Sequence, residues 1–241
     1  MEPRALYSEA YAAAYRALYV DHPMWHAKHA MNLGLVRALV PPGGRWLDAC
    51  CGQAWHFTQV VGVAKTGVDL SPAQLARARR DNPDARFLEA DVLAAELGER
   101  FDLVTSFWGA YAYLDDHARI AAFVARAIEW TAPGGALYLE LLTPDTLAAF
   151  NATAFADQTA SAVEIRGVLA DGVAWSFHDP GGRHDLTCPS IGFFERALAP
   201  WFHTVEVRGV VATMAQLVAV GRTSERMIDR SRERVVDRER G

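Results

Sequence analysis

The chain has 241 residues, of which 51% are hydrophobic and 22% are charged, and its formal net charge is −5. This length and apolar content suit one large α/β domain, or one domain with a cap. The acidic balance, and the lack of any basic run in the central region, argue against a nucleic-acid partner.

Cysteine usage and the N-terminal sequence bear on the compartment. Cys50 and Cys51 are adjacent and Cys188 stands alone, so the spacing predicts no structural zinc site and favours a reducing environment. Acids, arginine and tyrosines interrupt the first residues, where a signal peptide would be continuously apolar. We therefore expect a cytoplasmic protein with no membrane partner and no bound metal, either a monomer or a homodimer.

Helical and strand periodicities alternate along most of the chain. Residues 4–40 read as two helices, separated at residues 21–23 (DHP). Strands are then predicted at 45–49, 64–69, 86–89, 101–107 and 136–142, and helices at 54–61, 72–81, 93–98 and 117–131. This alternation is typical of parallel strands joined by crossover helices.

The alternation of strands and helices ends after residue 143. Two short strands are expected around a turn at Asp171 and Gly172, followed by a helix at 191–202. Strands at 203–209 and 212–222 are expected to form an antiparallel hairpin at the sheet edge. From residue 222 onward, arginines and acids each recur every four residues, which favours a solvated helix; a helix that forms a dimer is the alternative.

Carboxylates follow three successive predicted strands. Asp48 ends the first strand and is followed by small residues up to Gly52. Asp69 comes 21 residues after Asp48, at the end of the second strand, and Asp91 follows the third. Ligands of open parallel sheets bind at the carboxyl ends of the strands, where an acid near this spacing can bind ribose hydroxyls.

These acids suit a ligand with a cationic end, a ribose and an adenine. A pyrophosphate would fit poorly, because the loop reads CCGQAW with a single glycine instead of the G-x-G-x-x-G fingerprint. A nicotinamide oxidoreductase is therefore disfavoured.

The segments WLDACCGQAWHFTQV, TGVDLSPAQLARAR, FLEADVL, FDLVTSFWGAYAYL and APGGALYLELLTP follow each other as in a known family. In this the chain resembles class I S-adenosylmethionine-dependent methyltransferases. The resemblance implies an α/β, Rossmann-like seven-stranded sheet of order 3-2-1-4-5-7-6. It would carry an N-terminal helical lid (1–42), a core (43–222) with a cap insertion (143–200), and a charged tail (223–241). Cys50 and Ala54 replace two glycines of the family's loop, so that loop is expected to reach positive φ less easily.

The resemblance also implies the cofactor, S-adenosylmethionine, and the residues that would hold it. S-adenosylhomocysteine would be the product. Asp69 would bind the ribose hydroxyls and Leu70 would lie against the adenine, whose edge Asp91 and Val92 would hold. The methionine part would lie along Asp48, Ala49, Cys50 and Gly52, its carboxylate near Tyr7 or Tyr15, and its sulfonium near Phe107 and Trp108.

The predicted activity is methyl transfer to an oxygen or nitrogen of a small, aromatic molecule. The loop after the fourth strand reads WGAYAY and lacks the N-P-P-Y run of enzymes that methylate nucleic-acid or protein amines. His178 with Asp179 is the predicted general base, and His184 with Asp185 is a second His–Asp pair in the same segment. Turn formation is the alternative reading, and Tyr111 is a further catalytic candidate. Two alternatives remain open: a non-methylating reaction on the same cofactor, and a catalytically silent partner protein.

Overall fold

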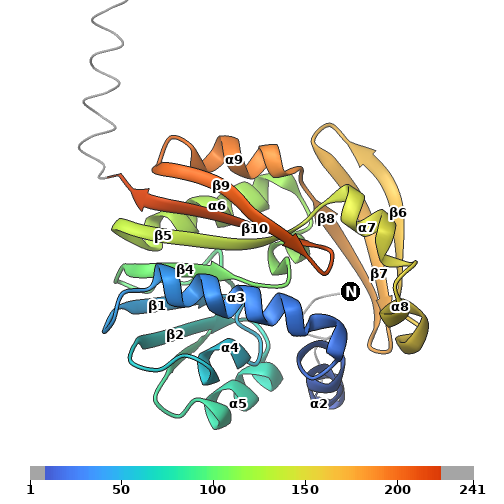
Figure 1. Cartoon of the computed structure of the whole chain (residues 1–241), viewed down its shortest axis with the longest axis horizontal. Coiled ribbons are helices and arrows are strands. Elements are labelled where there is room, and N and C mark those ends of the chain that lie inside the picture. The colour runs from blue at the N-terminus through green and yellow to red at the C-terminus, as the bar shows by residue number, and fades with distance from the viewer. Residues whose placement is uncertain (1–8, 224–241) are drawn as a thin grey trace, which may run out of the picture.

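The structure is a computed structural model that describes residues 9–223. Its main sheet has seven strands in the order β3-β2-β1-β4-β5-β10-β9, and β10 runs antiparallel to both neighbours (Figure 1). With β9 and β10 as the sixth and seventh strands, this confirms the predicted order. The strands are β1 (Arg45–Ala49), β2 (Ala64–Asp69), β3 (Arg86–Glu89), β4 (Phe101–Ser106), β5 (Thr131–Leu142), β9 (Phe202–Val211) and β10 (Met214–Arg222).

Two apolar layers cover the two faces of this sheet, as strand alternation requires. Trp46 packs on one face with helices α3 (His26–Leu39), α4 (Trp55–Thr58) and α5 (Pro72–Asp81). Leu47, the next residue, packs on the other face with α6 (His117–Trp130) and α9 (Ile191–Leu198). Burial of both faces explains why these strands are near-continuous apolar runs.

The N-terminal segment approaches the carboxyl ends of the strands. It comprises α2 (Glu9–Tyr15), a π-helical turn η1 (Arg16–Val20) and a 3₁₀ turn η2 (Pro23–Trp25) before α3 begins. The predicted break at residues 21–23 is confirmed: the side chain of His22 caps η2 and Pro23 occupies its first position.

The insertion after β5 forms a second, three-stranded antiparallel sheet with two helices at one end of the main sheet (Figure 1). It contains α7 (Pro144–Phe150), α8 (Ala154–Thr159), β6 (Ala162–Leu169), β7 (Gly172–Asp179) and β8 (Gly182–Cys188). The predicted hairpin at Asp171 and Gly172 is confirmed, but we did not predict β8 or the two helices. Residues 179–182 (DPGG) make a second hairpin turn, so the strand that follows it pairs with β7.

Several predicted boundaries differ from the structure. The helix predicted at 93–98 is wrong: this six-residue segment forms turns, too short to repay the cost of helix nucleation. The helices predicted at 54–61 and 191–202 end earlier, and β5 starts before its predicted first residue. A 3₁₀ turn, η3 (Ala110–Leu114), follows β4. The predicted β9–β10 hairpin is confirmed, and its turn residues Ala212 and Thr213 both have positive φ.

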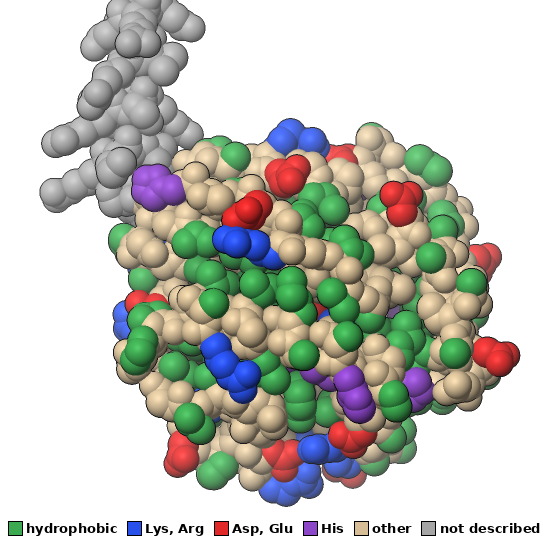
Figure 2. Space-filling view, viewed as in Figure 1, with side chains coloured by type: hydrophobic (Ala, Val, Ile, Leu, Met, Phe, Trp, Pro, Cys, Tyr) green, Lys and Arg blue, Asp and Glu red, His purple; other side chains and the backbone are tan. Residues whose placement is uncertain are grey.

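Within residues 9–223, no helix is long and apolar enough to cross a membrane, and no cluster of three metal-binding side chains occurs. On the described part of the face in Figure 2, basic and acidic side chains are dispersed among apolar ones. Tyr7 and nearly all of the charged tail lie outside the described residues.

Candidate active site

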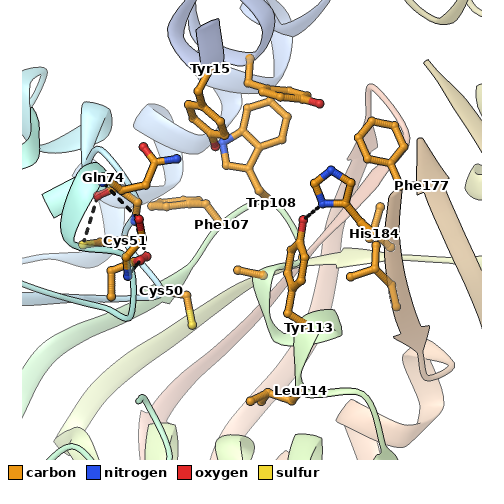
Figure 3. A pocket seen from close by; sticks show the side chains of 18 of the residues that line it. Tyr15, Cys50, Cys51, Gln74, Phe107, Trp108, Tyr113, Leu114, Phe177 and His184 are labelled. Carbon is orange, nitrogen blue, oxygen red and sulfur yellow. Dashed lines mark hydrogen bonds between the residues drawn. The ribbon is translucent and has the colours of Figure 1, made fainter. Parts of the chain in front are cut away.

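A cavity of about 800 Å³ lies at the carboxyl ends of the main strands. One wall is made by the loops after β1, β2, β3 and β4. Aromatic side chains of α2, η1 and η2 form a second wall, and residues of the small sheet form a third. Figure 3 shows side chains from all three regions around this space. Its volume falls in the range of small-molecule sites, so it has room for a ligand of this class.

Asp48 lies in the wall beneath the loop after β1 and is almost fully buried. The hydroxyl of Thr105 donates to Oδ1 of Asp48 at 2.8 Å and accepts from the indole of Trp46 at 2.9 Å. Burial raises the pKa of Asp48 well above its ordinary value, and the nearby Asp69 and Glu140 add to the effect. A positively charged ligand would therefore lower the cost of ionising this carboxyl group.

Asp69 links the loops after β1 and β2. Its two carboxylate oxygens accept the backbone N–H groups of Gly52 at 2.7 Å and Ser71 at 2.8 Å. Ser71 in turn caps α5 through the N–H of Gln74. Burial raises the pKa of Asp69, although these backbone hydrogen bonds oppose the rise. Each carboxylate oxygen can accept more than one hydrogen bond, so Asp69 can still receive ligand hydroxyls.

The loop after β1 has positive φ at both positions where another residue replaces a glycine of the family's loop. Cys50 has φ of 62° and Ala54 has φ of 51°, beside 52° at Gly52. The left-handed region costs non-glycine residues roughly 1–2 kcal/mol each, so the surrounding contacts must offset this strain. The loop therefore reaches positive φ at both replaced positions, at the cost that the replacements imply.

Other predicted cofactor residues lie along the same wall. Leu70, Asp91 and Val92 line the cavity, and Asp91 also accepts the backbone N–H of Leu93 at 2.9 Å. Tyr15 and Phe107 line the cavity as well. Ala49 is buried and does not line it. Tyr7 is outside the described residues.

Trp108 follows β4 and lines the cavity with a positive φ of 62°. Its backbone N–H donates to Oε2 of Glu140 at 2.7 Å, and the ammonium of Lys28 lies 3.3 Å from the centroid of its ring. Two buried groups, from α3 and β5, thus fix this side chain beside the strand ends.

The tyrosines of the N-terminal helices occupy the aromatic wall, as their four-residue spacing suggests. Ring centroids lie 6.3 Å apart for Tyr11 and Tyr15, and 5.0 Å apart for Tyr15 and Tyr19. The hydroxyls of Tyr11 and Tyr19 both donate to Oδ2 of Asp179, each at 2.5 Å. A Cβ added at Gly181 would collide with the ring of Tyr11, so the hairpin turn of the small sheet packs directly on α2.

Asp179 also binds a histidine, which is His184 and not its predicted partner His178. Nε2 of His184 lies 3.2 Å from Oδ1 of Asp179, and Nδ1 of His184 lies 2.5 Å from the hydroxyl of Tyr113 (Figure 3). His184 and Tyr113 both line the cavity. Burial alone would raise the pKa of Asp179, but hydrogen bonds from His184, Tyr11 and Tyr19 outweigh it and hold that pKa below its ordinary value.

The other two predicted catalytic residues lie away from the cavity. His178 does not line it, because strand alternation places its side chain on the face of β7 opposite Phe177 and Asp179. Tyr111 is fully buried against Phe194, and its hydroxyl accepts the N–H of Leu142 at 3.2 Å. Burial raises the pKa of Tyr111 well above its ordinary value. Asp179, the next residue after His178, and Tyr113, two residues after Tyr111, belong to the cluster with His184.

Fold and site together define a Rossmann-like domain with a cavity at the carboxyl ends of its strands. Residues 47–135 match the family model described as "Methyltransferase domain". The chain is 31% identical over 139 residues to dTDP-3-amino-3,4,6-trideoxy-alpha-D-glucopyranose N,N-dimethyltransferase of Streptomyces venezuelae. It is also 31% identical over 141 residues to dTDP-3-amino-3,6-dideoxy-alpha-D-glucopyranose N,N-dimethyltransferase of Streptomyces fradiae. These matches cover 56% and 57% of this chain, but only 58% and 55% of the two relatives.

Solved structures extend the likeness over most of the chain. DesVI of Streptomyces venezuelae has a TM-score of 0.65 and 24% identity, covering 87% of this chain and 97% of its own. CalS10, described as an amino pentose methyltransferase with bound S-adenosylmethionine from Micromonospora echinaspora, has a TM-score of 0.60 and 25% identity, covering 89% and 98%. The matched domain and the shared fold support a class I S-adenosylmethionine-dependent methyltransferase, with S-adenosylmethionine as its cofactor.

Proposed function

We propose that this chain transfers methyl groups from S-adenosylmethionine to the amine of a small molecule, and that the acceptor is an amino sugar carried on a nucleotide. The observation that carries the proposal is the row of aspartates, Asp48, Asp69 and Asp91, along one wall of a cavity of about 800 Å³. Acids at these positions suit a cationic sulfonium, a ribose and an adenine on one side, while the cap side leaves room for an acceptor.

The residues present fit the cofactor. Small side chains in the loop after β1 leave its backbone accessible, and Asp69 supplies carboxylate oxygens for the ribose. Leu70, Asp91 and Val92 would hold the adenine, and Tyr15 would lie near the methionine end. When bound, S-adenosylmethionine supplies an electrophilic methyl group: the new C–N bond forms as the C–S bond breaks, and that electron pair stays on sulfur.

The remaining work falls to the protein: it orients the acceptor nitrogen in line with the methyl group and keeps water out. The aromatic wall and the small sheet are joined through Asp179, so they would close over the acceptor together. Nitrogen is preferred over oxygen because the named relatives are N,N-dimethyltransferases of amino sugars. The sequence suggested an aromatic acceptor, but the names of these relatives describe amino sugars.

Purified protein incubated with S-adenosylmethionine and an acceptor panel tests this function. The panel contains dTDP-3-amino-3,6-dideoxyglucose, its 3-hydroxy counterpart and a simple phenol. We expect S-adenosylhomocysteine together with singly and doubly methylated product from the amine alone. Methylation of the phenol or of the hydroxy sugar would contradict the choice of acceptor. Cofactor binding without transfer to any acceptor would favour the non-methylating or silent alternatives.

A further inference from the structure

Tyr113, His184 and Asp179 form a hydrogen-bonded chain that leads from the cavity into the protein. Tyr113 comes from η3 and His184 from β8 (Figure 3), while Asp179 comes from the end of β7, so three separate elements bring them together. Tyr113 and His184 line the cavity, whereas Asp179 lies behind His184. This arrangement of carboxylate, imidazole and phenol suits the movement of a proton away from a bound molecule.

Three donors on Asp179 determine the direction of its hydrogen bond to His184. Tyr11, Tyr19 and the backbone N–H of Gly181 donate to its carboxylate at 2.5, 2.5 and 2.8 Å. An ionised carboxylate only accepts hydrogen bonds, so His184 must donate from Nε2. In neutral His184 the other nitrogen, Nδ1, then carries no proton and accepts the hydroxyl proton of Tyr113. A phenol oxygen has two lone pairs, so Oη of Tyr113, which lines the cavity, can accept a proton from a molecule bound there.

We propose that Tyr113, His184 and Asp179 form a proton relay for the acceptor amine; this rests on the proposed function. An amine that arrives as an ammonium ion has no lone pair and cannot attack a methyl group. As its N–H bond breaks, the proton binds Oη of Tyr113, and the hydroxyl proton of Tyr113 passes to Nδ1 of His184. The positive charge moves from the substrate to the imidazolium, which Asp179 stabilises, and the relay resets by losing a proton to solvent.

The other side chains around His184 are compatible with this role. The ring of Tyr11 on α2 has its centroid 6.2 Å from that of His184, and Phe177 on β7 lies at 5.5 Å. The neighbours of His184 on β8 are Arg183 and Asp185, which pair with each other at 2.9 Å. Asp179 is thus the acid in direct contact with the imidazole.

The first test of the relay needs no substrate. Long-range ¹H–¹⁵N spectra of the whole protein should show neutral His184 as the Nε2–H tautomer, with an Nδ1 resonance that shifts in Tyr113→Phe. His203, exposed on β9, serves as the reference and should not shift. An Nδ1–H tautomer, or an unchanged resonance in Tyr113→Phe, would overturn the relay whatever the substrate proves to be.

The second test measures kcat/KM against pH with S-adenosylmethionine and dTDP-3-amino-3,6-dideoxyglucose. At pH 7, Tyr113→Phe and His184→Gln should each be slower by roughly 100-fold, the size of a typical general-base contribution. The deficit should shrink as pH rises, because the amine then loses its proton in solution. A deficit of equal size at every pH would mean that these residues only shape the cavity, and would refute the relay.

The matched control is His203→Gln, which should follow the wild-type profile. Failure of the wild type to methylate this amine would count against the proposed function, while the tautomer spectra would still decide the relay.

Discussion

The ammonium of Lys28 lies 3.0 Å from Oε2 of Glu140, and neither side chain is exposed to solvent. The same carboxylate oxygen accepts the backbone N–H of Trp108. Burial lowers the pKa of Lys28, while the contact with Glu140 raises it. This pair therefore joins α3 and β5 to the strained residue that lines the cavity after β4.

Breaking this ion pair from one side should be costly. In Lys28→Met, Glu140 would stay buried without its counter-charge, so we expect the free energy of unfolding to fall by about 3–5 kcal/mol in urea denaturation. The double variant with Glu140→Gln should recover part of the loss, because no unpaired charge remains. Arg37→Met, on the exposed side of the same helix, should change stability by roughly 0.5 kcal/mol or less. Equal losses in Lys28→Met and Arg37→Met would contradict this reading.

Gly67, in β2, leaves space that the loop after β1 occupies. A Cβ at this position would lie 2.7 Å from Sγ of Cys51 and 2.8 Å from the ring of Phe87. We expect Gly67→Ala to reduce the free energy of unfolding by about 1–3 kcal/mol through overpacking. It should also weaken binding of S-adenosylhomocysteine, because Cys51 belongs to the cavity wall.

Gly167 provides the matched control for this substitution. It also lies in a strand, and a Cβ there would have no neighbour within 4 Å. Gly167→Ala should leave both stability and S-adenosylhomocysteine affinity near the wild-type values. If calorimetry gave the same stability and the same S-adenosylhomocysteine affinity for both variants, the close approach at Gly67 would not contribute to either.

His29 makes stability depend on pH. Burial, with a smaller effect of the adjacent Lys28, lowers the pKa of His29 to about 4 from an ordinary value of 6.5. Between these pH values the unfolded chain binds a proton at His29 and the folded chain does not. Folded-state stability should therefore be fully present above pH 6.5 and should decline as pH falls toward 4.

Urea denaturation of the wild type and of His29→Gln across this range isolates the effect. His56 has its pKa lowered by burial as well, so both proteins should lose stability on acidification. The wild type should lose more than His29→Gln. Parallel curves for the two proteins would show that His29 titrates alike in the folded and unfolded chains.

Asp69 should determine cofactor affinity. Asp69→Ala removes a charged acceptor, and a hydrogen bond to a charged group contributes about 1.5–3 kcal/mol, so affinity for S-adenosylhomocysteine should fall at least about tenfold by calorimetry. The variant also loses the contacts to Gly52 and Ser71, so its thermal unfolding is measured in parallel. Asp84→Ala, at an exposed acid after α5, should bind like the wild type. Unchanged affinity in Asp69→Ala would refute the ribose assignment.

The main sheet could be predicted because its central strands carry apolar runs and an acid stands at or just after the end of each of the first three strands. Leu47 and Trp46 face opposite layers, so the run around them is apolar throughout and marks a strand buried on both faces. The small sheet was harder, because one of its faces is exposed and its strands mix apolar and charged residues. The segment 93–98 contains good helix formers, but intrinsic propensity over six residues does not offset the cost of helix nucleation.

The acids at the strand ends were predictable for the same reason, since order along the chain places them on one edge. The cluster of Tyr113, His184 and Asp179 was not predictable in this way. Choosing between His178 and His184 depends on which face of β7 and β8 packs on α2, and this is a tertiary property. Tyr113 and Tyr111 likewise differ only in their orientation within η3. A hint was available in the pattern: His184 lies two residues beyond a predicted turn that also contains Asp179.

We propose that Asp48, Asp69 and Asp91, at the carboxyl ends of β1, β2 and β3, hold the cofactor within the cavity of about 800 Å³. A crystal structure of the protein with S-adenosylhomocysteine tests it most directly. The account predicts the ribose hydroxyls on Asp69, the adenine between Leu70 and Asp91, and the sulfur near Phe107 and Trp108. Cofactor bound elsewhere, or a complex in which Asp69 contacts only its own backbone partners, would contradict it.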